Sequence, residues 1–168
     1  AHDACVVAAD IKLEAAQETA KMAAENSRGT VIAASVDVTD EASVQRMVEI
    51  CVERFGRLDC AVNAAGIEGD RAPMHSMSVA NFDAVLGVNT KGVFLCMRAQ
   101  LAQMLRQPPP EAASVGSKRT RRGAVAAPVD ACNYSIVNIA STAGQGAMPE
   151  FAAYSASKHA IIGLTRTA

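Results

Sequence analysis

Two residues near the end of the sequence, Tyr154 and Lys158, stand four apart in a stretch with helical character. Residues four apart share one face of a helix. A free phenol has a pKa of about 10 and is a poor acid or base at neutral pH, but a nearby ammonium group favours the phenolate and lowers that pKa. The pair can therefore act as a tuned proton donor and acceptor, although such pairs are also common on solvated helix faces.

Two further polar residues follow predicted strands. Ser141 comes just after a strand at 135–139, and its hydroxyl could bind a substrate oxygen or cap a turn. Asp10 closes a strand at 5–9. A carboxylate there can accept hydrogen bonds from ribose hydroxyls and would repel a 2′-phosphate, or it can cap the next helix. Because ligands bind beyond the carboxyl ends of parallel strands, both residues are site candidates.

A run of small residues ends the third predicted strand, and it consists of Asn63, Ala64, Ala65 and Gly66. Small side chains let a flat ligand approach the backbone closely. The alternative interpretation is a tight turn from a strand into a helix.

The elements that must position these residues alternate along the chain. Strands are predicted at 5–9, 30–36, 58–62 and 135–139, and helices at 13–25, 40–55, 79–105 and 151–168. Strands separated by helices of this length predict βαβ crossovers and a parallel sheet. The strands are apolar throughout, which predicts helices on both faces of the sheet. The fold class is therefore α/β, in one domain over 1–168.

The segment from Gln107 to Cys132 has no usable periodicity and contains three consecutive prolines. Loops of this length are usually functional or disordered, and we expect a disordered surface insertion at 107–132. The basic cluster Lys118–Arg122 could contact nucleic acid, but we expect it to be solvated.

Composition excludes several classes of function. The chain has 16 Lys and Arg against 17 Asp and Glu, a net charge of −1, so no global charge attracts nucleic acid or a membrane surface. No apolar run is long enough to cross a membrane, and no secretory signal is visible. The odd number of cysteines, 5, and the scattered histidines predict reduced thiols and no metal site. We therefore expect a cytoplasmic protein.

Six short motifs occur together in one order. They are Asp10 after V-V-A-A, D-V-T-D at 37–40, N-A-A-G at 63–66, V-N-T-K-G at 88–92, I-V-N-I-A-S at 136–141 and Y-S-A-S-K at 154–158. With these motifs in this order, the chain resembles the short-chain dehydrogenase/reductase family over nearly its whole length, apart from 107–132. The resemblance implies a Rossmann-like, doubly wound parallel sheet.

The resemblance implies an oxidoreductase that interconverts an alcohol and a ketone by hydride transfer with a nicotinamide cofactor. Tyr154 matches the catalytic acid/base, and Lys158 the lysine that lowers the tyrosine's pKa. Ser141 matches the serine that orients the substrate oxygen, and Asn89 the asparagine that fixes a water in the proton relay. Tyr154 and Lys158 are also implied contacts of the nicotinamide ribose.

The same resemblance implies the other cofactor contacts. Asp37 and Val38 match the adenine contact, and 63–66 the strand end beside the cofactor, where Ala64 replaces a second asparagine. Asp10 matches the residue that selects NAD over NADP, although nearby Lys12 could soften that preference. The implied cofactor is NAD, with NADP as the alternative. The implied partners are a small alcohol or ketone and further copies of the chain, with no nucleic acid and no membrane.

The family begins with a strand and a T-G-x-x-x-G-x-G turn that holds the cofactor pyrophosphate, and this pattern is absent from the sequence. That strand lies between the strands that match 5–9 and 58–62, so we expect both to lack a neighbour. We interpret the sequence as a fragment that also lacks the C-terminal lobe. The alternative function is a catalytically inactive scaffold that forms dimers.

Overall fold

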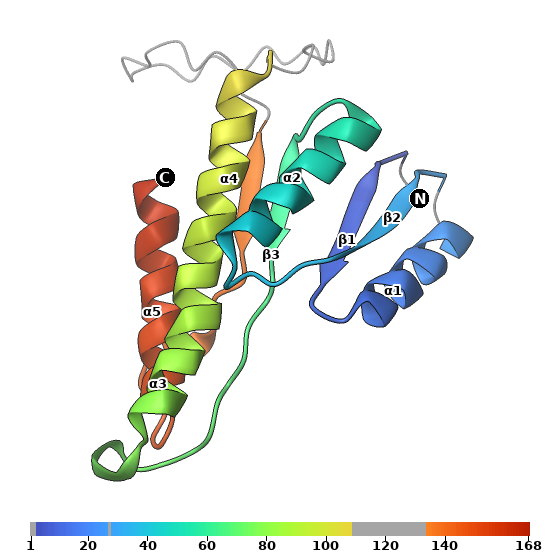
Figure 1. Ribbon diagram of the computed structural model, residues 1–168. Coiled ribbons are helices and arrows are strands. Elements are labelled where there is room, and N and C mark those ends of the chain that lie inside the picture. Colours follow the sequence, from blue (N-terminus) through green and yellow to red (C-terminus); the bar gives the residue numbers. More distant parts are fainter. Residues whose placement is uncertain (1–2, 27, 109–133) are drawn as a thin grey trace, which may run out of the picture.

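The computed structural model describes residues 3–26, 28–108 and 134–168. Its strands are β1 (Val6–Asp10), β2 (Val31–Ser35), β3 (Cys60–Asn63) and β4 (Ser135–Asn138). Its α-helices are α1 (Leu13–Asn26), α2 (Glu41–Phe55), α3 (Val79–Leu86), α4 (Val93–Arg106) and α5 (Ala152–Thr167). Strands and helices alternate as expected for an α/β fold (Figure 1).

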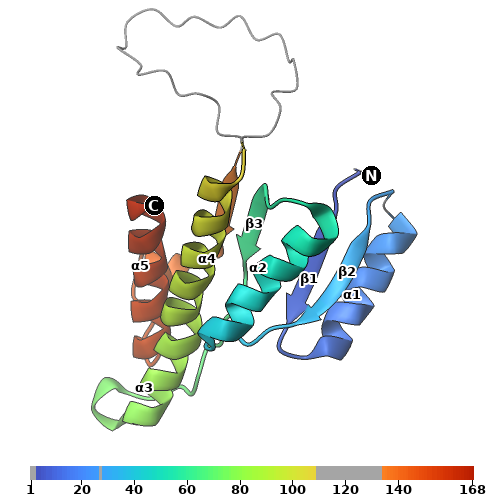
Figure 2. The same ribbon diagram turned by 45° about the horizontal axis from the view of Figure 1, so that its top comes forward.

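The strands form two separate parallel pairs. β1 pairs with β2 from Val6 opposite Val31, and β3 pairs with β4 from Cys60 opposite Ser135. Within the described residues β1 and β3 are not hydrogen-bonded to each other, although they are the inner strands of the two pairs (Figure 2). The expectation that these two strands lack a shared neighbour is therefore confirmed.

The expectation that every strand is covered on both faces is wrong for β3 and β4. Exposed and more buried residues alternate along both strands, and Val62 and Val137, which lie opposite each other, are 65% and 48% exposed. Their neighbours Asn63 and Ile136 face inward, where Ile136 packs against the core around Val93 on α4. One apolar face of this pair is thus open in the described part of the chain.

The helix predicted over 79–105 is interrupted. A π-helical turn, η2 (Gly87–Gly92), separates α3 from α4, which otherwise continue one another. A π turn inserts an extra residue into a helical turn and is frequent at functional sites. The apolar spacing on either side stays helical, so periodicity alone does not reveal such a turn.

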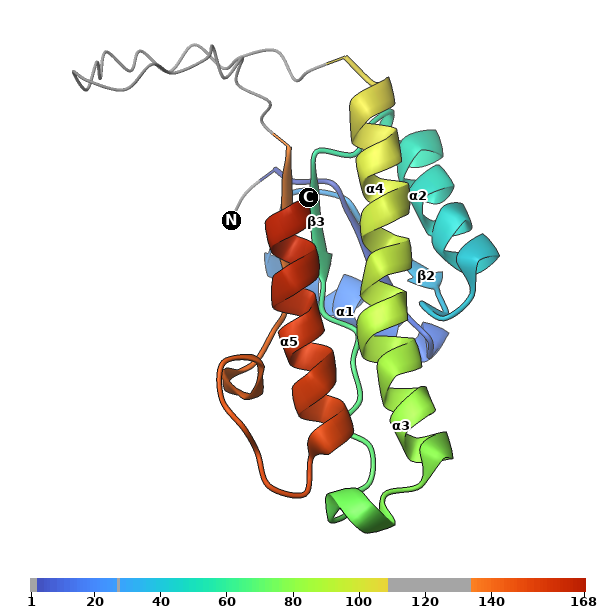
Figure 3. The same ribbon diagram turned by 90° about the vertical axis from the view of Figure 1, so that its left-hand side faces the viewer.

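The strands β3 and β4 lead toward the lower end of the molecule as drawn in Figure 1, where α3, η2 and the start of α5 lie. Figure 3 shows the loops after both strands reaching the start of α5. The carboxyl ends of these strands and the candidate site residues therefore share one end of the fold. None of the helices in the described ranges is long and apolar enough to span a membrane.

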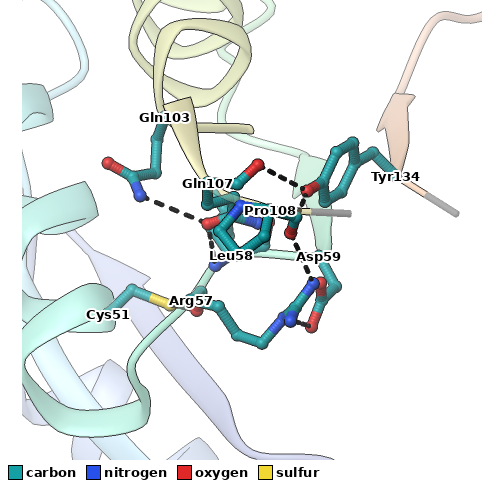
Figure 4. Close-up of polar contacts among 8 residues, drawn as sticks. All are labelled: Cys51, Arg57, Leu58, Asp59, Gln103, Gln107, Pro108 and Tyr134. Atoms are coloured by element: carbon teal, nitrogen blue, oxygen red, sulfur yellow. Dashed lines mark hydrogen bonds and ion pairs between the residues drawn. The ribbon is translucent and has the colours of Figure 1, made fainter. Parts of the chain in front are cut away.

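The predicted insertion at 107–132 and its basic cluster Lys118–Arg122 fall almost wholly outside the described residues. The two described residues that flank 109–133 are joined at the opposite end of the strands from the site, because the hydroxyl of Tyr134 donates to the carbonyl of Pro108 at 2.8 Å (Figure 4). Beside them, the amide of Gln107 accepts from the backbone N–H of Leu58 at 3.0 Å and donates to its carbonyl at 2.6 Å. One side chain thus bonds both backbone groups of Leu58, two residues before β3 begins.

We expect Gln107→Ala to lower the free energy of unfolding by about 1–3 kcal/mol, because the partly buried N–H and carbonyl of Leu58 lose their partners. Gln45→Ala is the matched control, since it removes an exposed glutamine whose partner Glu49 lies on the same helix. Urea denaturation of both variants measures the difference. Equal midpoints for the two variants would contradict this role of Gln107.

Candidate active site

The side chain of Asn89, in η2, is fully buried and makes three hydrogen bonds. Its Oδ1 accepts from the backbone N–H of Ile67 at 2.8 Å, and its Nδ2 donates to the carbonyl of Ile67 at 2.8 Å and to Ser157 Oγ at 2.9 Å. Asn89 therefore ties the π turn to the loop after β3 and to α5. The widened turn places this side chain where all three segments meet.

Lys158 is only 5% exposed and lies beside this junction. Its ammonium donates to the carbonyl of Ile139, just beyond β4, at 2.9 Å and lies 5.5 Å from the centre of the Tyr154 ring. Burial lowers the pKa of Lys158, because the charged form loses hydration. The Lys158 ammonium and the Tyr154 ring are therefore held near one another.

The strand-end motif 63–66 divides into two parts. The amide of Asn63 points into the core, where Nδ2 donates to Gln100 at 3.0 Å and to Asn138 at 2.8 Å, so its side chain joins α4 to both strands. Ala64, Ala65 and Gly66 are exposed beyond it. The structure therefore gives the Asn63 side chain a positioning role and leaves the approach to the site to the residues after it.

Gly66 lies close to Asn89 and Lys158. A Cβ at this position would lie 3.2 Å from Asn89 Oδ1 and 3.6 Å from Lys158 Nζ. The absence of a side chain at Gly66 therefore lets the loop after β3 lie close to these two buried polar groups.

Ser141 starts a short 3₁₀ turn, η3 (Thr142–Gly144). Its Oγ accepts from the backbone N–H of Ala143 at 3.2 Å, so the hydroxyl hydrogen is left to donate to a substrate oxygen. Gly144 packs this turn against α5, because a Cβ there would lie 2.7 Å from the carbonyl oxygen of Lys158. Ser141 and Lys158 are therefore held on adjacent segments.

Asp10, Asp37 and Val38 lie at the ends of β1 and β2. The carboxylate of Asp37 accepts from the hydroxyl and the N–H of Thr39 at 2.7 and 2.8 Å, and these bonds lower the pKa of Asp37. Asp10 is exposed and accepts from the N–H of Lys12 at 2.8 Å. The orientation of the Asp10 carboxylate is thus fixed by this hydrogen bond to the backbone two residues later.

The candidate residue Val38 lies against the π turn at a glycine. A Cβ on Gly92, the last residue of η2, would lie 2.8 Å from Val38 Cγ2. The predicted adenine contact therefore adjoins the same π turn that carries Asn89. The same turn thus contacts Val38 through Gly92 and Ser157 on α5 through Asn89.

The structure adds residues that sequence reasoning missed. Ser157 is fully buried and joins Asn89 to α5, and Gln100 is a buried amide in an otherwise apolar part of α4. Gln100 could have been noticed as a polar residue inside the predicted apolar face. Ser157 has no such signal, because serine is common on exposed helix faces.

The groups that a nicotinamide dinucleotide would need are partly present. The exposed Asp10 carboxylate at a strand end suits ribose hydroxyls, and the exposed Gly66 close to the Lys158 ammonium suits the approach of a flat ring to the backbone. The residues that would hold its two ends thus fit the group. No glycine-rich pyrophosphate turn occurs in the 168 residues.

Comparison with known proteins agrees with this geometry. The family model described as "short chain dehydrogenase" matches residues 1–132 and 123–168. The chain belongs to the short-chain dehydrogenase family. This membership confirms the resemblance on which the roles of the site residues depend.

The chain is 36% identical over 146 residues to an A-factor type γ-butyrolactone 1′-reductase of Streptomyces virginiae, covering 87% of this chain and 47% of the relative. It is 35% identical over 164 residues to 2-(R)-hydroxypropyl-CoM dehydrogenase of Xanthobacter autotrophicus, covering 96% and 56%. The crystal structure of NAD⁺-bound xylitol dehydrogenase superimposes with a TM-score of 0.76 at 31% identity, covering 97% and 53%. The chain thus spans about half the length of the relatives that it matches.

We expect the thermal stability of the unmodified chain to rise relative to Lys158→Met as the pH increases from 7 toward 10.5. The folded state holds Lys158 with a lowered pKa, whereas the unfolded state keeps the ordinary value near 10.5. Between these values the unfolded state binds more protons, so higher pH favours the fold. Melting curves of both proteins across this range measure the trend.

Lys21→Met, at an exposed position on α1, is the control and should show no such trend. A difference between the unmodified chain and Lys158→Met that is independent of pH would contradict the burial of a titrating Lys158.

Proposed function

We propose that this chain forms the catalytic part of a nicotinamide-dependent oxidoreductase that interconverts an alcohol and a ketone. The observation that carries the proposal is the buried Lys158 ammonium beside Tyr154, with the exposed Gly66 next to it. A cation next to a phenol stabilises the negative charge that the phenol oxygen acquires when it gives up its proton to a substrate. Family membership supports the same reaction class.

Each residue has a distinct task in the proposed reaction. When bound, a nicotinamide cofactor supplies or accepts the hydride. In reduction, the Tyr154 phenol donates its proton to the oxygen of the carbonyl group, and the charge of Lys158 stabilises the tyrosinate that remains. The hydroxyl of Ser141 donates a hydrogen bond to the same substrate oxygen. In oxidation, tyrosinate accepts the proton of the alcohol.

The proposed cofactor is NAD. The exposed Asp10 carboxylate at the end of β1 would accept hydrogen bonds from the ribose hydroxyls and repel the extra phosphate of NADP. A structural relative is described as NAD⁺-bound, which supports this choice. Lys12, two residues away, leaves NADP as the alternative.

The proposal includes a small alcohol or ketone as substrate and further copies of the chain as partners. Two relatives are named as a γ-butyrolactone 1′-reductase and a 2-(R)-hydroxypropyl-CoM dehydrogenase, and these names support the proposed substrate class. Two apolar side chains of α4, Phe94 and Leu105, are 45% and 81% exposed and could pack between copies. The free thiols of the described cysteines suit a cytoplasmic location.

We expect Tyr154→Phe, in the protein at its natural length, to lower NAD(H)-dependent turnover by roughly 10²–10⁴-fold, because the proton donor is lost. The affinity for NADH should change little, since the phenylalanine ring keeps the shape of the site. Stopped-flow measurement of NADH oxidation with a panel of ketones, and NADH titration by fluorescence, give the two quantities.

Tyr134→Phe is the matched control, because it removes the other tyrosine hydroxyl of the chain at the opposite end of the strands. Turnover in that variant should be unchanged. Full turnover in Tyr154→Phe would refute the assignment of the acid/base. Absence of hydride transfer in the unmodified protein with every ketone would favour the alternative, an inactive scaffold.

A further inference from the structure

Glu150 has an unusual backbone conformation. Among the described residues other than glycine, it alone has a positive φ, 66°. Residues with side chains are disfavoured in this left-handed region, and they stay there only where their surroundings hold them. The contacts around Glu150 must therefore hold it in this conformation.

Three contacts hold Glu150 and the residue after it. The carbonyl of Glu150 accepts from the backbone N–H of Ala72 at 3.0 Å, and its carboxylate pairs with the Arg71 guanidinium at 3.1 Å. The same guanidinium lies 5.0 Å from the centre of the Phe151 ring. We name Arg71, Ala72, Glu150 and Phe151 the cross-loop clasp, since it joins the loop after β3 to the loop after β4.

The clasp ends directly at α5. Phe151 precedes the first residue of that helix, and its carbonyl accepts from the N–H of Ser155 at 2.8 Å, which closes the first helical turn. The Phe151 ring meets the Tyr154 ring edge to face, with the ring centres 6.4 Å apart and the planes at 65°. The position of Tyr154 is thus linked to Arg71 through one intervening ring.

We propose that Arg71 is a positioning residue for Tyr154. The guanidinium holds Glu150 in its left-handed conformation by charge and holds Phe151 by stacking. Phe151 in turn fixes the direction in which the Tyr154 phenol leaves α5. The inference rests on the proposed function of Tyr154, because only an acid/base at this position requires such control.

The two contacts of Arg71 require different properties. A lysine supplies the charge for Glu150 but lacks the planar guanidinium that stacks on an aromatic ring. Arg71→Lys should therefore restore part of what Arg71→Ala removes. This partial rescue separates a positioning role from a general effect on folding.

The chain offers a spectroscopic test that needs no cofactor. It has no tryptophan and two tyrosines, so in a Tyr134→Phe background Tyr154 alone gives the tyrosine band in near-ultraviolet circular dichroism. We expect Arg71→Ala to lose most of this band while the far-ultraviolet helical signal is retained. Arg71→Lys should recover an intermediate band.

Arg98→Ala is the matched control. Arg98 also pairs with a glutamate, Glu41, and lies over a phenylalanine ring, that of Phe94, at 5.8 Å, but it is on α4. Its removal should leave the Tyr154 band unchanged. If Arg71→Ala does not fold, Glu150→Gln breaks the same ion pair while keeping the size of the side chain, and it should reduce the band.

The outcomes separate the inference from the proposed function. An unchanged Tyr154 band in Arg71→Ala, or an equal loss in Arg98→Ala, would overturn the positioning role. A specific loss, together with a lower kcat and an unchanged KM for NADH in the protein at its natural length, supports both claims. A specific loss in a protein that shows no turnover even unmodified supports the clasp and refutes the proposed function.

Discussion

The buried amide of Asn89 is the constraint on which the rest of the site depends. A fully buried amide that loses its hydrogen bonds costs about 1–3 kcal/mol for each unsatisfied group. Asn89 meets this requirement with both backbone groups of Ile67 and with Ser157 Oγ. Three segments must therefore come together around it: the π turn, the loop after β3 and α5.

That junction dictates the residues around it. Segments can meet this closely only where side chains are absent. An added Cβ would crowd Asn89 at Gly66, the Lys158 carbonyl at Gly144 and Val38 at Gly92. The close packing buries Lys158, and burial lowers its pKa beside the Tyr154 ring. The electrostatics of the candidate site are thus a consequence of packing.

Much of this arrangement could be predicted from the sequence, because strong apolar periodicity and the motif ending in Tyr154 and Lys158 are local signals. The order and type of the strands and main helices follow from them. The π turn could not be predicted, since it depends on Asn89 reaching Ile67 across the fold. The exposed face at Val62 and Val137 was also missed, because an apolar strand sequence does not show whether a helix covers it. Arg71 and Glu150 meet only in three dimensions.

The most direct test of the central role of Asn89 is amide hydrogen exchange at Ile67, measured by NMR in the unmodified chain and in Asn89→Ala. Ile67 donates its N–H to Asn89 Oδ1 at 2.8 Å. Loss of this bond should speed exchange at Ile67 by about tenfold or more. The amide of Val44, bonded to Asp40 at the start of α2, should exchange as before. Unchanged exchange at Ile67, or equal acceleration at Val44, would contradict the account.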